Sequence, residues 1–264
     1  MKKWLFLSVL IIWGCENEPL GMLDINEEMV VEFVDEETDP LNQDLIAWYS
    51  FNNNTNDSSV NGLHGVLYKG EYGECRSNQE YSSLQLDIDD NPSWGENNDR
   101  VEIEYDPIMD VSNITISSWI NIQEKPTPYN DRNYSIASRW FTNYTPEEEE
   151  KGCFSFYVDD NKSLAFTNRD YNIISNPYII ENNEWTHVAV TIDDEKIRFY
   201  INGGFIYEEI LGEDFKLPVN SINLLLGERQ MYNGYWYHFE GKLDDIGIWG
   251  RALSPCEILE VYNK

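Results

Sequence analysis

The sequence predicts an all-β protein in which consecutive antiparallel strands are followed by one short C-terminal helix. Apolar side chains recur at every second position in residues 185–192 and 196–201, as they do in strands that bury one face. Asn202 and Gly203 separate the second run from a third, residues 205–210, and both residue types tolerate the positive φ of a two-residue hairpin turn. We therefore expect three neighbouring antiparallel strands.

The C-terminal segment predicts the last strand and the helix. Ile246 and Ile248 alternate with small or polar residues, which is typical of a half-buried strand. Ser254 then offers an N-cap, Pro255 suits the first helical position, and Glu257 can reach back to the cap. A strand leading into a capped helix is expected here.

Clusters of Asn, Asp, Gly and Pro separate the other alternating runs. The strands expected from these runs are residues 45–51, 65–68, 83–86, 100–104, 115–122, 134–139, 153–158, 163–167, 185–192, 196–201, 205–210, 222–226 and 241–249. They predict one large all-β domain, and the chain is long enough to bury a core.

With these segments in place, the chain resembles the laminin-G-like, concanavalin A-like lectin/glucanase family. The segments that carry the resemblance stand in the family's order: residues 45–51, 56–65, 114–119, 185–191, 200–203 and 239–259. The resemblance implies a jelly-roll β-sandwich of two antiparallel sheets. It does not give the function, because one fold hosts lectins, glycan-binding modules, adhesion domains and glycosidases.

The N-terminus is typical of an export signal. Two lysines follow Met1, and residues 4–13 are apolar but too few to span a bilayer. Gly14 and Cys15 end a segment that resembles a bacterial lipobox, which implies removal of residues 1–14 and lipidation of Cys15. An ordinary signal peptide with an incidental cysteine is the alternative.

Residues 15–44 are expected to form an acidic tether that leads to the folded domain, residues 45–264. This stretch has many carboxylates, few aromatic residues and no Lys or Arg, so it lacks the apolar surface that would offset the entropy of ordering. Acidic residues soon after Cys15 resemble the surface-export signals of Bacteroidetes-type lipoproteins, which implies an outer-membrane anchor and exposure at the cell surface. A strand over residues 29–34 is the alternative.

The charge and the cysteines limit the possible partners and cross-links. A formal net charge of −30 argues against nucleic acid and against an anionic membrane surface, so membrane contact is expected through the lipid anchor only. Besides Cys15 the chain has Cys75, Cys153 and Cys256. An exported protein permits one disulfide among these three, and their spacing leaves all three pairings open.

No catalytic residue is assigned from the sequence. The glycosidase branch of the resembling superfamily commonly carries Glu-x-Asp-x-Glu on one strand. Glu102, Glu104 and Asp106 stand in another order and are expected on the solvated face of a strand. No Gly-x-Ser-x-Gly elbow is present, and His187 is expected to be a structural hydrogen-bonding residue.

The resemblance implies a structural calcium ion at the edge of the sandwich, held by carboxylates and loop carbonyls. Asp57 and Asp244 match the side-chain ligands, and Asn61 and the carbonyl of His64 are weaker candidates. The alternative is that Asp57 forms an Asx-turn and Asp244 caps loop amides without a metal.

Aromatic residues in long loops predict a glycan site, because a sugar offers C–H faces for stacking and hydroxyls for hydrogen bonds. The candidate ligand-binding residues are Trp140, Tyr144, Tyr129, Arg132, Tyr232, Tyr235 and Trp236. Self-packing of these loops is the alternative. The tryptophans in strand motifs, which are Trp48, Trp119, Trp185 and Trp249, are expected in the core.

The expected function is that of a surface-anchored, non-catalytic carbohydrate-binding lipoprotein with lectin-like recognition of a glycan or polysaccharide. A domain that binds protein within a surface lipoprotein complex, as an adhesin or scaffold, is the alternative from another class. A divergent glycosidase is a third hypothesis. It requires two carboxylates about 5 to 10 Å apart in a sugar-binding groove.

Overall fold

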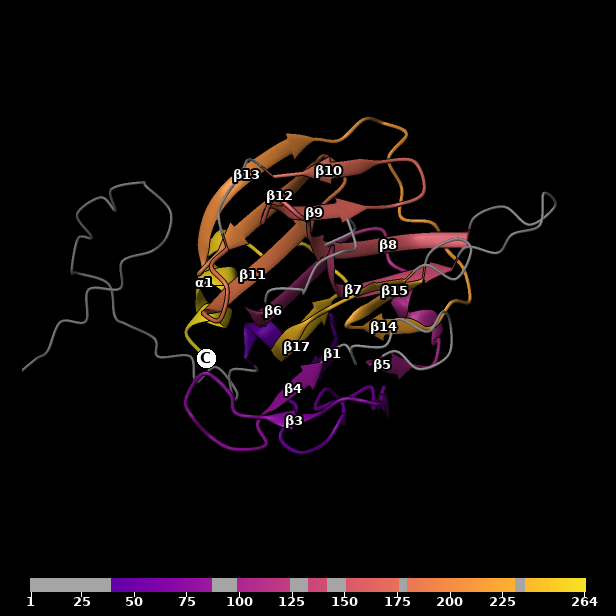
Figure 1. The fold of residues 1–264 in the computed structure, drawn as a ribbon. Helices are drawn as coiled ribbons and strands as arrows, with labels where there is room; N and C mark the ends of the chain where they lie inside the picture. Colours follow the sequence, from indigo (N-terminus) through magenta and orange to yellow (C-terminus); the bar gives the residue numbers. More distant parts are fainter. Residues whose placement is uncertain (1–38, 87–98, 124–132, 142–150, 176–179, 231–235) are drawn as a thin grey trace, which may run out of the picture. The chain divides into compact units, whose positions relative to one another are not determined.

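The computed structural model describes residues 39–86, 99–123, 133–141, 151–175, 180–230 and 236–264. In this part of the chain two large antiparallel sheets face each other, with one α-helix at the C-terminus (Figure 1). The predicted jelly-roll β-sandwich is confirmed. Among these residues no helix is long and apolar enough to cross a membrane.

The first sheet has eight strands among the described residues. Their order is β13 (Gly204–Ile210), β12 (Lys196–Ile201), β11 (Trp185–Ile192), β6 (Ile114–Ile122), β17 (Gly241–Trp249), β4 (Ser83–Leu86) and β3 (Glu71–Gly73), and β1 (Leu45–Tyr49) also pairs with β17. Asn202 and Gly203 both have positive φ, at 49° and 73°, in the turn between β12 and β13. The predicted hairpin is confirmed.

The second sheet has seven strands in the same part of the chain. Their order is β10 (Asn172–Ile174), β9 (Leu164–Thr167), β8 (Lys151–Val158), β7 (Tyr134–Phe141), β14 (Leu224–Leu226), β5 (Arg100–Ile103) and β2 (Val66–Tyr68). A two-stranded ribbon, β15 (Glu228–Gln230) with β16 (Trp236–His238), adjoins it, and short 3-10 helices lie at Pro40–Asn42 and Pro107–Met109. All the predicted strands are present; β3, β10, β15 and β16 were not predicted.

One hydrophobic core fills the space between the sheets. Val188 and Val190 of β11 contribute to it from the first sheet, and Phe156 and Phe166 contribute from the second. All four are fully buried. Because side chains alternate across a strand, the residues next to them lie on the outer faces of the sandwich.

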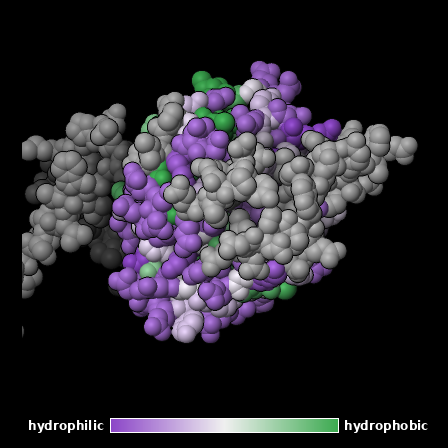
Figure 2. All heavy atoms as spheres, viewed as in Figure 1, coloured by the Kyte–Doolittle hydropathy of each residue, from purple (hydrophilic) through white to green (hydrophobic). Residues whose placement is uncertain are grey.

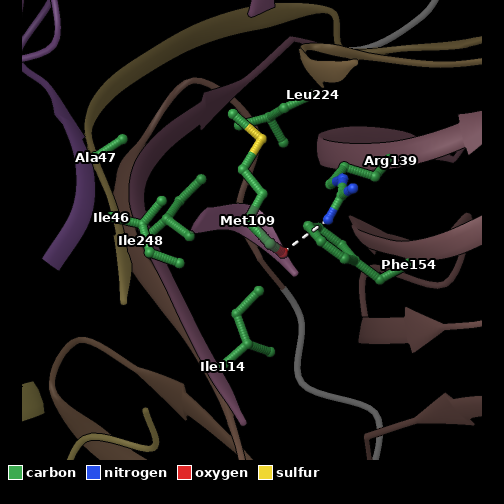
Figure 3. A pocket seen from close by; sticks show the side chains of 8 residues that line it. All are labelled: Ile46, Ala47, Met109, Ile114, Arg139, Phe154, Leu224 and Ile248. Atoms are coloured by element: carbon green, nitrogen blue, oxygen red, sulfur yellow. Dashed lines mark hydrogen bonds between the residues drawn. The ribbon is translucent and has the colours of Figure 1, made fainter. Parts of the chain in front are cut away.

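Arg139 of β7 is a charged residue at the margin of this core. Its guanidinium donates to the carbonyl of Met109 at 2.7 Å and to that of Asn220 at 2.6 Å, and it pairs with Asp110 at 3.0 Å. Figure 3 shows the guanidinium beside a small cavity. The volume of this cavity is about 10 Å³. The residues lining that cavity are Ile46, Ala47, Met109, Ile114, Arg139, Phe154, Leu224 and Ile248. Arg139 therefore has a structural role.

The helix α1 (Pro255–Tyr262) covers part of the outer face of the eight-stranded sheet. Ser254 and Glu257 form the predicted capping box, and Ile258 and Val261 enter a second apolar cluster with Trp249. The indole Nε1 of Trp249 donates to the carbonyl of Leu41 at 2.7 Å. Residues 39–44, expected as the end of the tether, thus contact the last strand.

The expectation for the four strand tryptophans was correct only in part. Trp249 is buried, whereas Trp48, Trp119 and Trp185 are half-buried, because they lie on the outer face or at a strand end. None of the three disulfide pairings that the sequence left open among Cys75, Cys153 and Cys256 is formed. Cys75 and Cys153 are both free, and each of the three possible pairings needs one of them.

His187 is buried on the outer face of β11, as a structural hydrogen-bonding residue. Its Nε2 lies 2.7 Å from the hydroxyl of Ser117, and the rings of Trp119 and Tyr262 contact its imidazole edge to face. Burial lowers the pKa of His187 to about 3, and the nearby charge of Arg76 acts in the same direction. The folded protein therefore holds this imidazole neutral.

We predict that His187 makes folding less favourable at mildly acidic pH. The unfolded imidazole takes up a proton below its ordinary pKa of 6.5 and the folded one does not, so stability falls as the pH falls from 6.5 toward 3. Between pH 7 and pH 5 this should remove about 2 kcal/mol from the free energy of unfolding. Denaturant titrations of the wild type and His187→Gln at both pH values measure it; equal pH dependence in the two proteins would contradict it.

Candidate functional site

A pocket of about 220 Å³ lies at the outer face of the seven-stranded sheet. It is lined by Asn133, Tyr157, Thr167, Asn172, Arg229 and Tyr237. Tyr157 on β8, Thr167 on β9 and Asn172 on β10 each neighbour a residue whose side chain is in the core, so alternation directs them outward. Three adjacent strands thus supply one wall.

The ribbon β15–β16 supplies the other wall. The chain turns into this ribbon at Gly227, which has a φ of +84° and whose N–H donates to the carbonyl of Ile136 at 3.0 Å. A Cβ at this position would collide with the side chain of Leu86, so the turn requires glycine. Arg229 and Tyr237 follow on the paired strands, where they are partners in the ladder.

Aromatic rings surround the guanidinium of Arg229. Its Cζ lies 4.2 Å from the ring centroid of Trp140, 5.8 Å from that of Tyr157 and 5.7 Å from that of Tyr237. Arg229 is 7% exposed and Trp140 is 5% exposed. Such cation–π contacts are strongest where water is excluded, so the guanidinium is held in a fixed orientation.

Tyr157 joins this cluster to the rest of the wall. Its hydroxyl donates to Asn172 Oδ1 at 2.8 Å. Burial raises the pKa of Tyr157, and the charge of Arg229 opposes the rise. The hydroxyl is therefore a proton donor at neutral pH, and the pocket offers hydroxyl, amide and guanidinium groups beside aromatic faces.

The structure corrects the location predicted for Trp140. This residue was expected in an exposed loop, but it lies on β7, is buried, and contacts Arg229 with its ring. Trp236 is the first residue of β16 and pairs with Gln230. The other predicted ligand-binding residues, Tyr129, Arg132, Tyr144, Tyr232 and Tyr235, lie outside the described residues.

Sequence reasoning missed the residues that line the pocket. Tyr157 and Thr167 occur in strands, where an aromatic or β-branched residue is expected for structural reasons alone. Asn172 belongs to a strand too short to show alternation. Tyr237 gave a usable signal for the pocket, because it is the last residue of the aromatic cluster that follows Arg229 in the sequence.

Comparison with known proteins places this fold in a family. The model of the concanavalin A-like lectin/glucanases superfamily matches residues 95–259, more than half of the chain. The chain belongs to this superfamily. No curated protein sequence matches it significantly.

Solved structures share the superfamily fold at low sequence identity. Domain 4 of AbnA, a GH43 extracellular arabinanase from Geobacillus stearothermophilus solved in complex with arabinotriose, is 18% identical with a TM-score of 0.54, over 83% of this chain and 98% of that one. The binding domain of Paraclostridial Mosquitocidal Protein 1 is 17% identical with a TM-score of 0.60, over 84% and 52%.

The binding domain of botulinum neurotoxin DC, solved in complex with SialylT, is similar to the same degree. It is 17% identical with a TM-score of 0.57, over 84% of this chain and 52% of that one. The chain therefore spans about half the length of the two toxin binding domains. At sequence identities this low, the structural similarity shows a shared fold and nothing more.

Two of the three acids that were compared with the glycosidase motif of this superfamily have structural contacts. Glu102 accepts hydrogen bonds from Asn223 at 2.7 Å and from Arg100 at 3.2 Å. Asp106 accepts from the backbone N–H of Ile108 at 2.9 Å and caps a 3-10 helix. Neither lines the pocket, whose lining contains no carboxylate among the described residues.

Glu228 is the buried acid nearest in sequence to the pocket residues. It is fully buried, and its Oε1 lies 3.8 Å from Arg100 Nε and its Oε2 3.5 Å from His238 Nδ1. These contacts link β5 with both strands of the ribbon. Glu228 therefore supports the wall that carries Arg229.

The proposed calcium ligand Asp57 is occupied by donors from its own loop. Its Oδ1 accepts from the N–H groups of Trp48 and Ser59 at 2.9 and 2.8 Å. Its Oδ2 accepts from the N–H of Leu63 at 2.9 Å and from the Ser59 hydroxyl at 2.7 Å. This is the Asx-turn arrangement, which leaves little of the carboxylate for a cation.

The two weaker candidates are bound to the same region of the fold. Asn61 Nδ2 donates to the carbonyls of Leu45 and Ile46, both at 2.9 Å. The imidazole of His64 accepts at Nδ1 from the N–H of Asp57 at 3.1 Å. Both residues therefore stabilise the loop against β1.

Asp244 faces a guanidinium. Arg76 Nη1 donates to Asp244 at 3.1 Å and to Asp245 at 2.7 Å, and its Cζ lies 4.8 Å from the ring centroid of Trp119. Burial raises the pKa of Asp244 to about 8, the Asp245 charge adds to the rise, and Arg76 opposes it. In this arrangement Arg76 supplies the positive charge beside Asp244 and Asp245.

No group of three or more His, Cys, Asp or Glu side chains is placed to hold a metal ion within the described ranges. Calcium binding by Asp57 and Asp244 stays a prediction of the sequence. The contacts of Arg76 lead to a different expectation for stability, which can be measured directly.

We predict that Arg76, and not calcium, stabilises this edge of the sandwich. Arg76→Gln should lower the free energy of unfolding by about 2 kcal/mol, because it leaves Asp244 and Asp245 without the charged hydrogen-bond donor that they share. Arg198→Gln is the matched control, since Arg198 pairs with Asp193 and Glu208, which are more exposed than Asp244 and Asp245, and it should contribute less than about 1 kcal/mol.

Thermal unfolding of the wild type should also be recorded with EDTA and with added calcium. We expect the Tm of the wild type to be equal in both. A Tm that falls with EDTA and recovers with calcium would contradict this expectation and assign a calcium site.

Proposed function

We propose that this chain is a non-catalytic carbohydrate-binding domain and that the pocket between the seven-stranded sheet and the ribbon is its ligand site. The observation that carries the proposal is the pocket lining, in which Tyr157 and Tyr237 lie beside Asn172, Thr167 and Arg229. Aromatic faces with a few placed polar groups are what sugar recognition requires.

The size of the pocket suits one sugar unit. Its volume of about 220 Å³ lies below the roughly 300–1,000 Å³ of sites that enclose drug-sized ligands. One ring would enter, and the rest of a glycan would extend over the surface.

Two structural relatives support a sugar ligand. AbnA domain 4 was solved with arabinotriose, and the neurotoxin DC binding domain with SialylT. The lining that the structure describes holds no carboxylate, which supports binding over hydrolysis, since a glycosidase needs a pair of acids across the scissile bond.

Protein binding is the second candidate function. A relative, the neurotoxin DC binding domain, was also solved in complex with rat synaptotagmin II. A docking surface for protein calls for a contiguous apolar patch of several hundred Å². On the face in Figure 2 the coloured, described residues are mostly hydrophilic, and the hydrophobic ones form small separate groups. The hydrophilic character of the described residues on that face favours glycan binding over protein binding.

We also propose that the domain is displayed on the outer membrane through a lipid on Cys15, with residues 16–38 as part of an acidic tether. The support is the apolar run that ends in Gly14 and Cys15 and the acidic stretch that follows. This placement would bring a glycan-binding domain to polysaccharide outside the cell.

We predict that the full chain binds glycans on an array without releasing reducing sugar from any polysaccharide that binds. Asn172→Ala should weaken that binding roughly fivefold, the equivalent of about 1 kcal/mol for one neutral hydrogen bond. Asn56→Ala, at an exposed loop position outside the pocket, is the control and should bind like the wild type. Binding that is unchanged in Asn172→Ala would contradict the assignment of this pocket.

The lipid anchor has its own test. Metabolic labelling with an alkyne fatty acid in a lipoprotein-processing bacterial host should tag the wild type and leave Cys15→Ser untagged. Equal labelling of both proteins, or of neither, would contradict lipidation of Cys15.

A further inference from the structure

We propose that the pocket selects sugars that carry a carboxylate, such as uronic or sialic acids, and that Arg229 binds the carboxylate. This inference rests on the proposed glycan-binding function. It adds the chemical class of the ligand and one residue that determines specificity.

The charge within the pocket is opposite to that of the chain. The chain has a formal charge of −30, yet Arg229 is the charged member of the six lining residues, which otherwise are neutral. At physiological ionic strength charges are screened beyond about 8 Å, so a bound ligand responds to the nearest groups. The charge of Asp159 also acts on Tyr157 in the pocket wall, but less than that of Arg229 does. A carboxylate beside Tyr157 would therefore interact mainly with this guanidinium.

The aromatic contacts orient the guanidinium for such a ligand. Trp140 lies under it at 4.2 Å from ring centroid to Cζ, and Tyr157 and Tyr237 lie within 6 Å. A guanidinium has its five N–H donors at its planar edge, in a fork that matches a carboxylate in two parallel hydrogen bonds. With five donors, Arg229 can keep contacts to the protein and still bind a ligand.

Low exposure strengthens this interaction. Arg229 is more than nine-tenths buried, and a charged hydrogen bond is stronger where the local dielectric is low. Arginine is also more weakly hydrated than lysine, which lowers the cost of exchanging water for a carboxylate.

The remaining groups suit the neutral part of an acidic sugar. Asn172, Thr167 and Asn133 present amide and hydroxyl groups around the pocket, and Tyr157 and Tyr237 add ring faces and hydroxyls. A sugar ring has hydroxyls around its rim and C–H faces, so the same pocket can hold the ring while Arg229 binds its acid group.

The test measures affinities of the full chain by isothermal titration calorimetry. The acidic probes are tri-galacturonic acid and sialyllactose, and the neutral probes are galactotriose and lactose. We expect at least one acidic probe to bind ten times or more tightly than its neutral partner, and the acidic probe that binds identifies the source of the carboxylate. This comparison uses the wild type alone, so it remains decisive if variants fail to fold.

Variants then assign the effect to Arg229. Arg229→Gln should lose the preference for the acidic probe, and Arg229→Lys should keep only part of it, because lysine retains the charge and loses the fork. Arg198→Gln removes the same charge from the other sheet and should keep the preference.

The outcomes separate this inference from the proposed function. Neutral probes that bind as tightly as acidic ones, or an acidic preference that survives in folded Arg229→Gln, would overturn the inference and leave glycan binding in place. No binding of any probe or of any array glycan would overturn both.

Discussion

The packing of two sheets through one hydrophobic core determines which side chains remain for function. Each strand buries every second residue, such as Phe156 and Phe166, and thereby directs its neighbours to the outer faces. The two outer faces are then used differently. On the eight-stranded sheet, α1 and residues near Leu41 form a second apolar cluster. On the seven-stranded sheet, the outward residues form the pocket that includes Tyr157.

Most of the fold was predictable because its signals are local. The long strands alternate clearly, the Asn202–Gly203 turn has the required backbone, and Ser254 forms its capping box as expected. The strands that were missed, such as β10 and β15, contain three residues each, too few for a periodic pattern. β10 forms because β9 offers it a ladder, and β15 forms by pairing with the equally short β16. The information that decides these strands therefore lies elsewhere in the chain.

The candidate site was less predictable, because it depends on pairing between distant segments. Trp140 seemed to be a loop residue, yet it extends β7 and meets Arg229, which lies far along the sequence. The calcium assignment followed the family pattern at Asp57 and Asp244 and gave no reason to consider Arg76. A guanidinium that sits against two aspartates can be recognised only when the fold brings them together.

Gly227 couples the hydrophobic core to the pocket wall, two parts of the molecule whose residues can otherwise change independently. Residues on the pocket wall can change without disturbing the core, because their side chains point away from it. Gly227 is different, since its bare backbone contacts the core at Leu86 while the next residues lead to Arg229. During divergence, a side chain acquired at this one position would redirect the ribbon. Two homologues with the same six lining residues would then present them to solvent in different arrangements.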